Sequence, residues 1–570
     1  MRVALLIASA SLHGGIAMPH IAYLAILPEI VMLGGAILLL AVASLVRSAL
    51  NVTVITVSTL VISLASLAAA LWQFFDVQSH GAYTTLDHAV VLDGFSVLVT
   101  VLVASAMALT ALVGDGYQRR EGLAGPEFNV LAMVSATGAM LMGEANDLVI
   151  VFLGLEILSI ALYVLAAFNR RRAESGEAAL KYFLLGGFSS AIFVYGIALT
   201  YGATGTTNLT QIADFLAKNV VVSDGLLLAG LTLLLVGFAF KVAAVPFHMW
   251  TPDVYQGSPT PITGFMSAVA KAAGFAALIR VFVSSFGVLR VDWQPIIYAL
   301  AVVTLLVGAV LALIQTDIKR MLAYSSINHA GFVLLGLEAA GALGKVGARG
   351  VSSALYYLFA YTFMAIGSFA IVSVLGGRGD AAHEISNYKG LGKRQPFLAL
   401  AFAVLLLSQA GAPFTTGFWA KLQVVAAAVD ANSVPLAVIA MVSAAVAAFF
   451  YLRVVLLMYS PKKFVSDQEG DRLENLDASG DAVASTSARE PLWSGSGRQT
   501  ALVNELNATL LLESSPETIE VPDEREGDVV NVPVLAVVAI GICIAVTVGF
   551  GVFPAPLADF AHKASLLFMP

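Results

Sequence analysis

Long apolar stretches alternate with short polar loops along almost the whole chain. A hydrocarbon core of about 30 Å needs about 20 apolar helical residues for each crossing, and most of these stretches reach that length. The pattern therefore predicts an all-α polytopic membrane protein with about fourteen transmembrane helices. The expected spans are 22–46, 51–75, 91–113, 126–143, 146–168, 178–202, 224–246, 258–283, 294–314, 319–339, 351–376, 397–425, 433–459 and 531–553.

Four ionisable side chains interrupt these apolar stretches. Glu156 lies in VFLGLEILSIALYVLAAF, Lys241 in GFAFKVAAVPFHMW, Lys271 in SAVAKAAGFAAL and Lys421 in GAPFTTGFWAKLQVV. A charge at bilayer depth costs at least about 2.5 kcal/mol, so such residues usually pair across helices or line a route for ions or protons. The four residues therefore indicate a transport protein.

Two of the lysines have a proline nearby in the same predicted span. Pro246 follows Lys241, and Pro413 precedes Lys421. Proline removes a backbone donor and frees the carbonyl four residues earlier, here that of Val242 in the first case, so both helices are expected to break. A matched pair of broken helices is typical of a transporter built from repeats, with its site near mid-membrane.

The positive charges of the loops predict the orientation. Positively charged loops resist translocation, and one alternate set of loops carries most of these charges. That set should face the cytoplasm, which places both termini outside and the acidic segment 461–530, which we expect to be largely disordered, in the cytoplasm. The cytoplasmic set contains Arg47, Arg119, Arg120, Arg170, Arg171, Arg172, Lys319, Arg320, Lys389, Lys393 and Arg394.

Composition narrows the class further. The chain is 59% hydrophobic and 12% charged, which excludes an ordinary soluble enzyme, and its net charge of -7 comes largely from the 461–530 segment and indicates no nucleic-acid surface. Cys543 is the single cysteine, whereas an iron–sulfur cluster normally takes four thiolates. We expect no cofactor and no metal in this chain, and any redox chemistry in other subunits.

Five ordered blocks resemble a known family, the N subunits of bacterial proton-pumping NADH:quinone oxidoreductase (respiratory complex I), which are antiporter-like membrane subunits. The resemblance covers roughly residues 20–460. The blocks are VFLGLEILSIALYVLAAF, GFAFKVAAVPFHMWTPDVYQGSPTPITGFMSAVAKAAGFAAL, DIKRMLAYSSINHAGFVLLG, ALYYLFAYTFMAIGSFA and LLSQAGAPFTTGFWAKLQVV.

The resemblance implies a fourteen-helix subunit of the bacterial cell membrane with two inverted five-helix repeats and with helices 7 and 12 broken. FMN, iron–sulfur clusters and quinone are then expected in other subunits, and the partners are the other membrane subunits, including sister antiporter-like subunits, and the lipid bilayer. The domains expected are an N-terminal extension (1–20), helices 1–3 (21–125), two repeats (126–290 and 291–460), the acidic loop (461–530) and the last helix with its tail (531–570).

Residue by residue, the resemblance assigns proton translocation to the four buried charges. Glu156 and Lys241 are expected to form a coupling pair, Lys271 to bridge towards the second half of the chain, and Lys421 to lie on the exit side. Burial disfavours a charged lysine and a nearby carboxylate favours it, so the proton affinity of such a pair is switchable. Ser159, on nearly the same helix face as Glu156, is expected to bond the carboxylate, and so is Tyr163 seven positions after it.

Three further residues are weaker candidates for relays. His248 and His329 lie in blocks that match the family, although helix capping or ordinary packing explains either histidine nearly as well. Lys181 follows an Arg-rich loop, and its ammonium is expected to reach the cytoplasmic surface unless it serves as a relay.

Alternatives remain open on this evidence. One alternative is that Lys241 and Lys421 serve only to bond carbonyls freed by the prolines, and another is that Glu156 is a fixed ion-pair anchor. A cation/proton antiporter subunit of the Mrp type and a membrane subunit of a hydrogenase-linked complex share the predicted architecture. The lysines at 271 and 421 resemble the N subunits more than those relatives, in which histidine in the eighth helix is more common.

Overall fold

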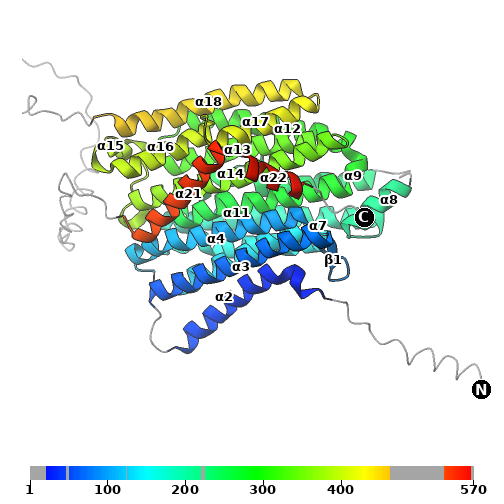
Figure 1. Ribbon diagram of the computed structural model, residues 1–570, viewed down its shortest axis with the longest axis horizontal. Coiled ribbons are helices and arrows are strands. Elements are labelled where there is room, and N and C mark those ends of the chain that lie inside the picture. Colours follow the sequence, from blue (N-terminus) through cyan, green and yellow to red (C-terminus); the bar gives the residue numbers. More distant parts are fainter. Residues whose placement is uncertain (1–20, 47–50, 124, 220–224, 462–531, 566–570) are drawn as a thin grey trace, which may run out of the picture. The chain divides into compact units, whose positions relative to one another are not determined.

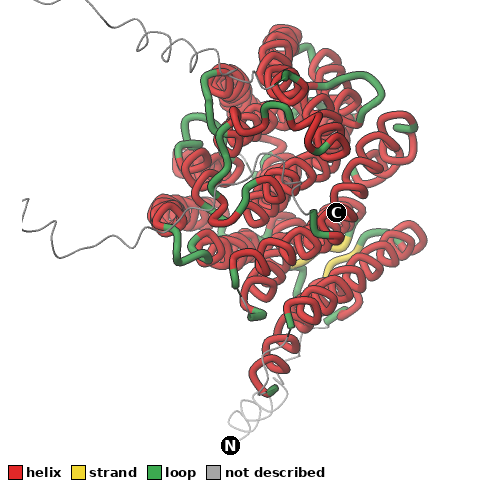
Figure 2. The backbone as a smooth tube through the Cα atoms, turned by 90° about the vertical axis from the view of Figure 1, so that its left-hand side faces the viewer, coloured by secondary structure: helices red, strands yellow, loops and turns green. Residues whose placement is uncertain are grey.

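A computed structural model describes residues 21–46, 51–123, 125–219, 225–461 and 532–565. The chain divides into a first unit of residues 1–460 and 530–570 and a second of residues 461–529. The expected N-terminal extension and acidic loop therefore lie outside the described residues, and everything below concerns the first unit. Its helices run side by side across Figure 1, and Figure 2 shows them nearly end-on.

The helices follow the predicted apolar stretches closely. The first half contains α2 (Leu27–Leu45), α3 (Val52–His80), α4 (Gly94–Glu121), α5 (Glu127–Glu144), α6 (Leu148–Ala166), α7 (Ala173–Thr204), α8 (Leu209–Lys218), α9 (Gly225–Val242), α10 (Trp250–Gly257) and α11 (Thr260–Ile279). The second half contains α12 (Arg290–Leu313), α13 (Ile318–Ala340), α14 (Lys345–Leu375), α15 (Leu391–Arg394), α16 (Pro396–Ala410), α17 (Thr416–Asp430), α18 (Val434–Tyr459), α21 (Val534–Val552) and α22 (Ala555–Ala564).

Within the described ranges, eleven helices are long and apolar enough to cross a membrane. The remaining predicted spans are also helical, as α5, α13 and the pair α16 and α17. The all-α polytopic fold is confirmed, whereas the count of fourteen and the inversion of the repeats stay predictions. A small antiparallel hairpin, β1 (Tyr83–Thr85) with β2 (Val90–Leu92), precedes α4 and was not predicted.

The same helix start occurs once in each half. Asp147 caps α6 by accepting the backbone N–H of Val149, and Asp317 caps α13 by accepting that of Arg320. Aspartate is among the best N-cap residues, because its carboxylate satisfies a backbone donor that the helix leaves unpaired. Each aspartate also forms an isolated antiparallel bridge, Asp147 with Asn208 and Asp317 with Glu384.

Both proline-containing helices break, as predicted. The seventh span stops as α9 at Val242 and continues only as α10 from Trp250, with Ala243 at a φ of 61° between them. The twelfth span stops as α16 at Ala410, turns at Gly411 with a φ of 95°, and resumes as α17. Glycine adopts this left-handed conformation without strain.

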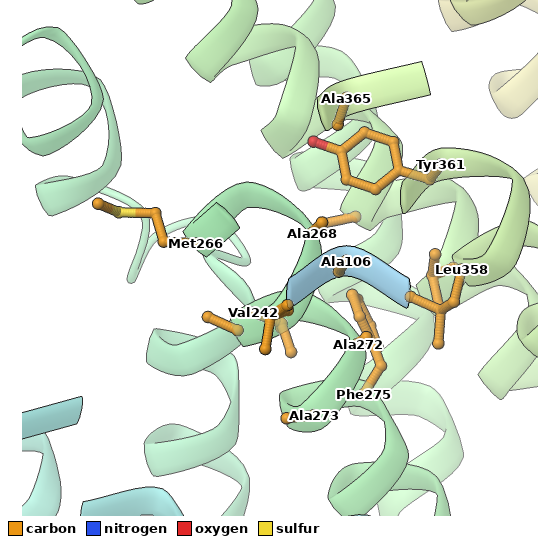
Figure 3. Close-up of a cluster of buried hydrophobic side chains, with 14 of the residues drawn as sticks. Ala106, Val242, Met266, Ala268, Ala272, Ala273, Phe275, Leu358, Tyr361 and Ala365 are labelled. Carbon is orange, nitrogen blue, oxygen red and sulfur yellow. The ribbon is translucent and has the colours of Figure 1, made fainter. Parts of the chain in front are cut away.

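Helices α4, α11 and α14 form the centre of the described bundle and are almost wholly buried. Alanines on α11 let its neighbours approach closely. Figure 3 shows Ala272 and Phe275 of α11 near Ala106 of α4 and Leu358 of α14. Lys271 lies within this alanine-rich helix, so its ammonium must find its partners inside protein.

The last long helix, α21, packs against α4, α14 and α17. Trp419 Nε1 donates to the carbonyl of Gly551 at 2.9 Å. A Cβ at Gly551 would clash with the backbone of Phe414 and Thr415. The turn between α16 and α17 is therefore covered by a helix that comes from beyond residue 530.

Candidate functional site

Lys241 lies in the last turn of α9 and is buried, with 3% of its surface exposed. Its Nζ donates to the hydroxyl of Ser159 on α6 at 2.7 Å. The hydroxyl of Ser159 in turn donates to the carbonyl of Leu155. The first lysine of the site is thus held by a side chain of a neighbouring helix, and its acceptor is a hydroxyl that can also donate.

Glu156 is half-buried on α6 and accepts a hydrogen bond from the hydroxyl of Ser190 on α7. Among the described residues it forms no direct ion pair with Lys241, so the expected coupling pair is close without being in contact. Ser159 was expected to bond the carboxylate and instead accepts the bond from the lysine, because it points inward whereas Glu156 lies between exposed Leu153 and Ile157.

A small cavity of about 10 Å³ lies beside Lys241. Ser190, the partner of Glu156, lines it together with Ser159, Tyr163 and Lys241. A polar cavity of about 10–15 Å³ is roughly the smallest that holds one water. The arrangement provides room for one water between the serine bound to the carboxylate and the lysine.

Lys271 is buried on α11, and its Nζ donates to the carbonyl of Val242 at 3.0 Å. This is the carbonyl that Pro246 was expected to free. The sequence suggested Lys241 as its partner, but a lysine from the next membrane helix bonds it instead. Lys271 therefore joins the break of the seventh span to the central helix α11.

A network of polar side chains surrounds His329 on α13. Its Nδ1 lies 2.6 Å from the hydroxyl of Tyr357, and its Nε2 lies 3.1 Å from that of Tyr451. Tyr451 also contacts Ser325 and the side-chain oxygen of Gln409 on α16. Because both ring nitrogens have hydroxyl partners, the imidazole can take a proton on one side and release it on the other.

A second set of hydroxyls connects α11 to α13. The Tyr361 hydroxyl on α14 donates to Ser326 at 2.7 Å and also bonds Ser267 on α11. Ser267 lies one helical turn from Lys271, and Ser326 lies one turn from His329, as their sequence spacing shows. The hydroxyl groups of Ser267, Tyr361 and Ser326 therefore lie between the part of α11 that carries Lys271 and the part of α13 that carries His329.

Lys421 is buried on α17, just after the break of the twelfth span. Its Nζ donates to the carbonyl of Ala410 at 2.9 Å and lies 5.0 Å from the ring centre of Phe332. The ammonium therefore bonds the last residue of α16, and the aromatic face adds a favourable contact. Lys421 holds the two halves of the broken helix together.

The other two candidate relays differ in position. His248 is buried in the turn between α9 and α10, and its Nδ1 has no partner among the described residues. Lys181 is 43% exposed and pairs with Glu177 at 2.7 Å and with Asp253 at 2.8 Å. The structure thus supports the surface position for Lys181 and keeps it apart from the buried lysines.

Asp380 was not singled out in the sequence, yet it is a buried hub. It accepts the hydroxyl of Thr260 at 2.6 Å and lies 3.3 Å from Lys319 and 3.4 Å from Arg172. Burial acts to raise the pKa of the Asp380 carboxyl, but Lys319 and His383 hold it well below its usual range. Asp380 lies in the loop sequence RGD. No local pattern marks it as a buried hub, because its partners come from three distant segments.

The chain is similar in sequence and in fold to known membrane subunits. A family model described as NADH:quinone oxidoreductase/Mrp antiporter, TM, matches residues 145–447. NADH-quinone oxidoreductase subunit N of Trichlorobacter lovleyi is 45% identical over 376 residues, which cover 66% of this chain and 76% of that protein.

Solved structures share the fold. A chain of respiratory complex I from Thermus thermophilus with bound aureothin has a TM-score of 0.68 and 28% identity, and the match covers 93% of this chain and 98% of that one. A chain of the Mrp complex from Dietzia sp. has a TM-score of 0.75 at 20% identity, covers 96% and 97%, and shows the fold alone. With these matches, the chain belongs to the subunit N family of NADH-quinone oxidoreductase, within the wider group of antiporter-like transmembrane subunits.

Proposed function

We propose that this chain translocates protons through Glu156, Lys241, Lys271 and Lys421, coupled to quinone reduction in other subunits of an NADH:quinone oxidoreductase. One observation supports the proposal. Three buried lysines each donate a hydrogen bond, either to a hydroxyl of a neighbouring helix or to a carbonyl at a helix break, and polar side chains lie between them. A buried charge is rare without such a role.

The first step is a change in the position of one carboxylate. With Glu156 near Lys241, the negative charge stabilises the protonated amine; with Glu156 drawn away, desolvation favours release of the proton. Ser190 holds the carboxylate, and one water in the cavity beside it would link that serine to Lys241. Because Glu156 is half-buried, its position is open to influence from a neighbouring subunit.

The released proton moves towards the second half of the chain. Lys271 is anchored at Val242, directly after Lys241 in the sequence, and the hydroxyls of Ser267 and Tyr361 lie between its surroundings and those of His329. His329 and Tyr451 continue the network to Gln409, next to the residue that holds Lys421. His248 is a candidate relay at the first break, with a ring nitrogen free to bind a proton.

The chain is expected to have no catalytic activity alone. Within the described ranges, no three His, Cys, Asp or Glu side chains are grouped to hold a metal ion. FMN, iron–sulfur clusters and quinone would belong to other subunits, which together with sister antiporter-like subunits and lipid cover the apolar outer faces. We place the chain in a bacterial cell membrane with both termini outside and the 461–530 loop in the cytoplasm.

The test is NADH-driven proton uptake in membrane vesicles that carry Lys241→Ala. We expect proton uptake and quinone reductase activity to fall together in a complex that still assembles. Lys345→Ala, which removes an exposed lysine at the start of α14, is the matched control and should leave both activities unchanged. Normal uptake and normal reductase activity in the Lys241 variant would reduce the lysine to a structural role.

An Mrp-type cation/proton antiporter subunit is the second candidate, because the family model and the fold include Mrp proteins. A hydrogenase-linked membrane subunit is a third. The identity with subunit N proteins favours the first reading. Proton uptake that requires sodium and continues without NADH would favour the Mrp reading instead.

A further inference from the structure

A second group of buried ionisable residues lies apart from the lysines. Glu29 is in the first turn of α2, Asp93 caps α4, Glu144 ends α5 and Arg280 follows α11. All four are buried, and Glu144 has no exposed surface. This group thus combines three acidic side chains with a single cation, and none of the four residues belongs to the proposed proton route.

Arg280 has its hydrogen bonds committed elsewhere. Its Nη1 and Nη2 donate to the two carboxylate oxygens of Asp93 at 2.9 and 2.8 Å, and its Nε donates to the carbonyl of Gly143 at 3.0 Å. Such a bidentate pair between guanidinium and carboxylate is a strong, charge-assisted arrangement. The positive charge of Arg280 is therefore balanced by Asp93, and within the described part of the chain neither glutamate forms an ion pair.

Glu29 and Glu144 face each other where α2 packs against α5, and their carboxyl groups interact. Both carboxyl oxygens of Glu29 and one of Glu144 are buried with no donor among the described residues, and the other Glu144 oxygen accepts only the Thr100 hydroxyl at 3.4 Å. An ionised carboxylate is an acceptor only. A hydrogen bond between two carboxyl groups therefore requires a proton on one of them.

We propose that Glu29 and Glu144 form a proton-binding site in which the two carboxyl groups share one proton. Two buried like charges in contact cannot both stay ionised, and a pair of carboxyl groups relieves the repulsion by keeping a proton between them. The Asp93–Arg280 pair is the charged group that faces them, and Thr100 is the nearby hydroxyl. The site rests on this geometry and does not depend on the proposed proton route.

The chemistry favours a proton over a metal cation. Hard cations such as Ca²⁺ take about six to eight oxygen ligands, whereas this site offers two carboxylates and one hydroxyl beside a guanidinium. Within the part of the chain that the structure describes, no group of three acidic, histidine or cysteine side chains is placed to hold a metal.

The experiment is infrared spectroscopy of the purified, assembled complex at neutral pH in H₂O and D₂O. A protonated carboxyl group gives a C=O stretching band that an ionised one lacks, and the band shifts in D₂O. We expect Glu29→Gln and Glu144→Gln each to remove the band of one carboxylic acid, and the double variant to remove no more than either single variant. A double variant that loses twice the intensity would mean two separate protons and would overturn the shared site.

Controls separate the remaining outcomes. Asp115→Asn removes a buried carboxylate that is paired with Arg119, and it should leave the band unchanged. Spectra of the glutamine variants that match the wild type would show that both glutamates are ionised, and a band lost on adding sodium would identify a cation site; either result overturns the proposal. If the glutamine variants fail to assemble, Thr100→Val keeps both carboxyls and should shift the band, and an unshifted band would count against the pair.

Discussion

The two broken helices differ in where their lysine lies. In the seventh span Lys241 precedes the break and bonds a hydroxyl on another helix, whereas in the twelfth span Lys421 follows the break and bonds the main chain of its own span. The carbonyl of the first break is instead served by Lys271. At each break, one lysine therefore donates to a backbone carbonyl: Lys271 at the first and Lys421 at the second. Lys241 is an additional candidate lysine in the first half, and it bonds a hydroxyl.

The helices beside the breaks explain the difference. Counted from their capping aspartates Asp147 and Asp317, α6 has Glu156 where α13 has Ser326, and α6 has Ser159 where α13 has His329. The first half therefore combines a carboxylate with a lysine that bonds a hydroxyl, and the second half combines a histidine with tyrosines. Under the proposed function, the same backbone plan serves as a switch in the first half and as a relay in the second.

The largest effect should come from Lys271→Met, which removes both the proposed proton carrier and the donor to the Val242 carbonyl. An orphaned buried carbonyl costs about 1–3 kcal/mol, and an increase of about 1.4 kcal/mol in a barrier is a tenfold fall in rate. We expect proton uptake to fall at least about tenfold. Lys271→Arg keeps the charge and the donor, so vesicle measurements on both variants check the assignment, and equal uptake in the two would contradict it.

Lys421→Met should come next. It removes the donor to Ala410, and the free energy of unfolding should fall by about 1–3 kcal/mol. We expect a thermal shift of the assembled complex and a smaller loss of uptake than for Lys271→Met. Phe332→Leu, which removes only the aromatic contact, is the matched control. A larger loss of uptake in Lys421→Met than in Lys271→Met would reverse the comparison between the breaks.

Ser159→Ala tests the first switch more gently. It removes the acceptor of Lys241, and a net hydrogen bond is worth about 0.5–1.5 kcal/mol, so we expect a two- to tenfold fall in uptake by about the same energy scale. The equivalent site in the second half is His329, and His329→Gln offers the direct comparison in the same assay. Wild-type uptake in Ser159→Ala would show that the hydroxyl is dispensable.

Lys181→Ala should have the smallest effect. Exposed ion pairs contribute about 0–1 kcal/mol, and Lys181 is partly exposed at the surface with two acidic partners. Uptake and reductase activity should stay at wild-type levels in vesicles. A loss comparable to that of Ser159→Ala would instead place Lys181 on the proton route.

Local patterns predicted the helices and both breaks, because apolar runs and prolines act within a few residues of the backbone. The partners of the charges were harder to predict. The bond from Lys271 to Val242 and the bond from Ser190 to Glu156 each join two different helices, and no periodicity within one helix specifies such contacts. The Glu29–Glu144 pair was missed for the same reason, since it joins α2 to α5.

The packing of α21 against the turn between α16 and α17 has a consequence for biosynthesis. That turn is translated more than a hundred residues before Gly551, whose backbone packs against it and whose carbonyl accepts the Trp419 N–H. A nascent chain therefore waits with this junction uncovered until the ribosome has passed the acidic segment. Premature termination anywhere in that segment leaves an insertion intermediate in which the turn between α16 and α17 is uncovered, and such an intermediate is a substrate for membrane quality control.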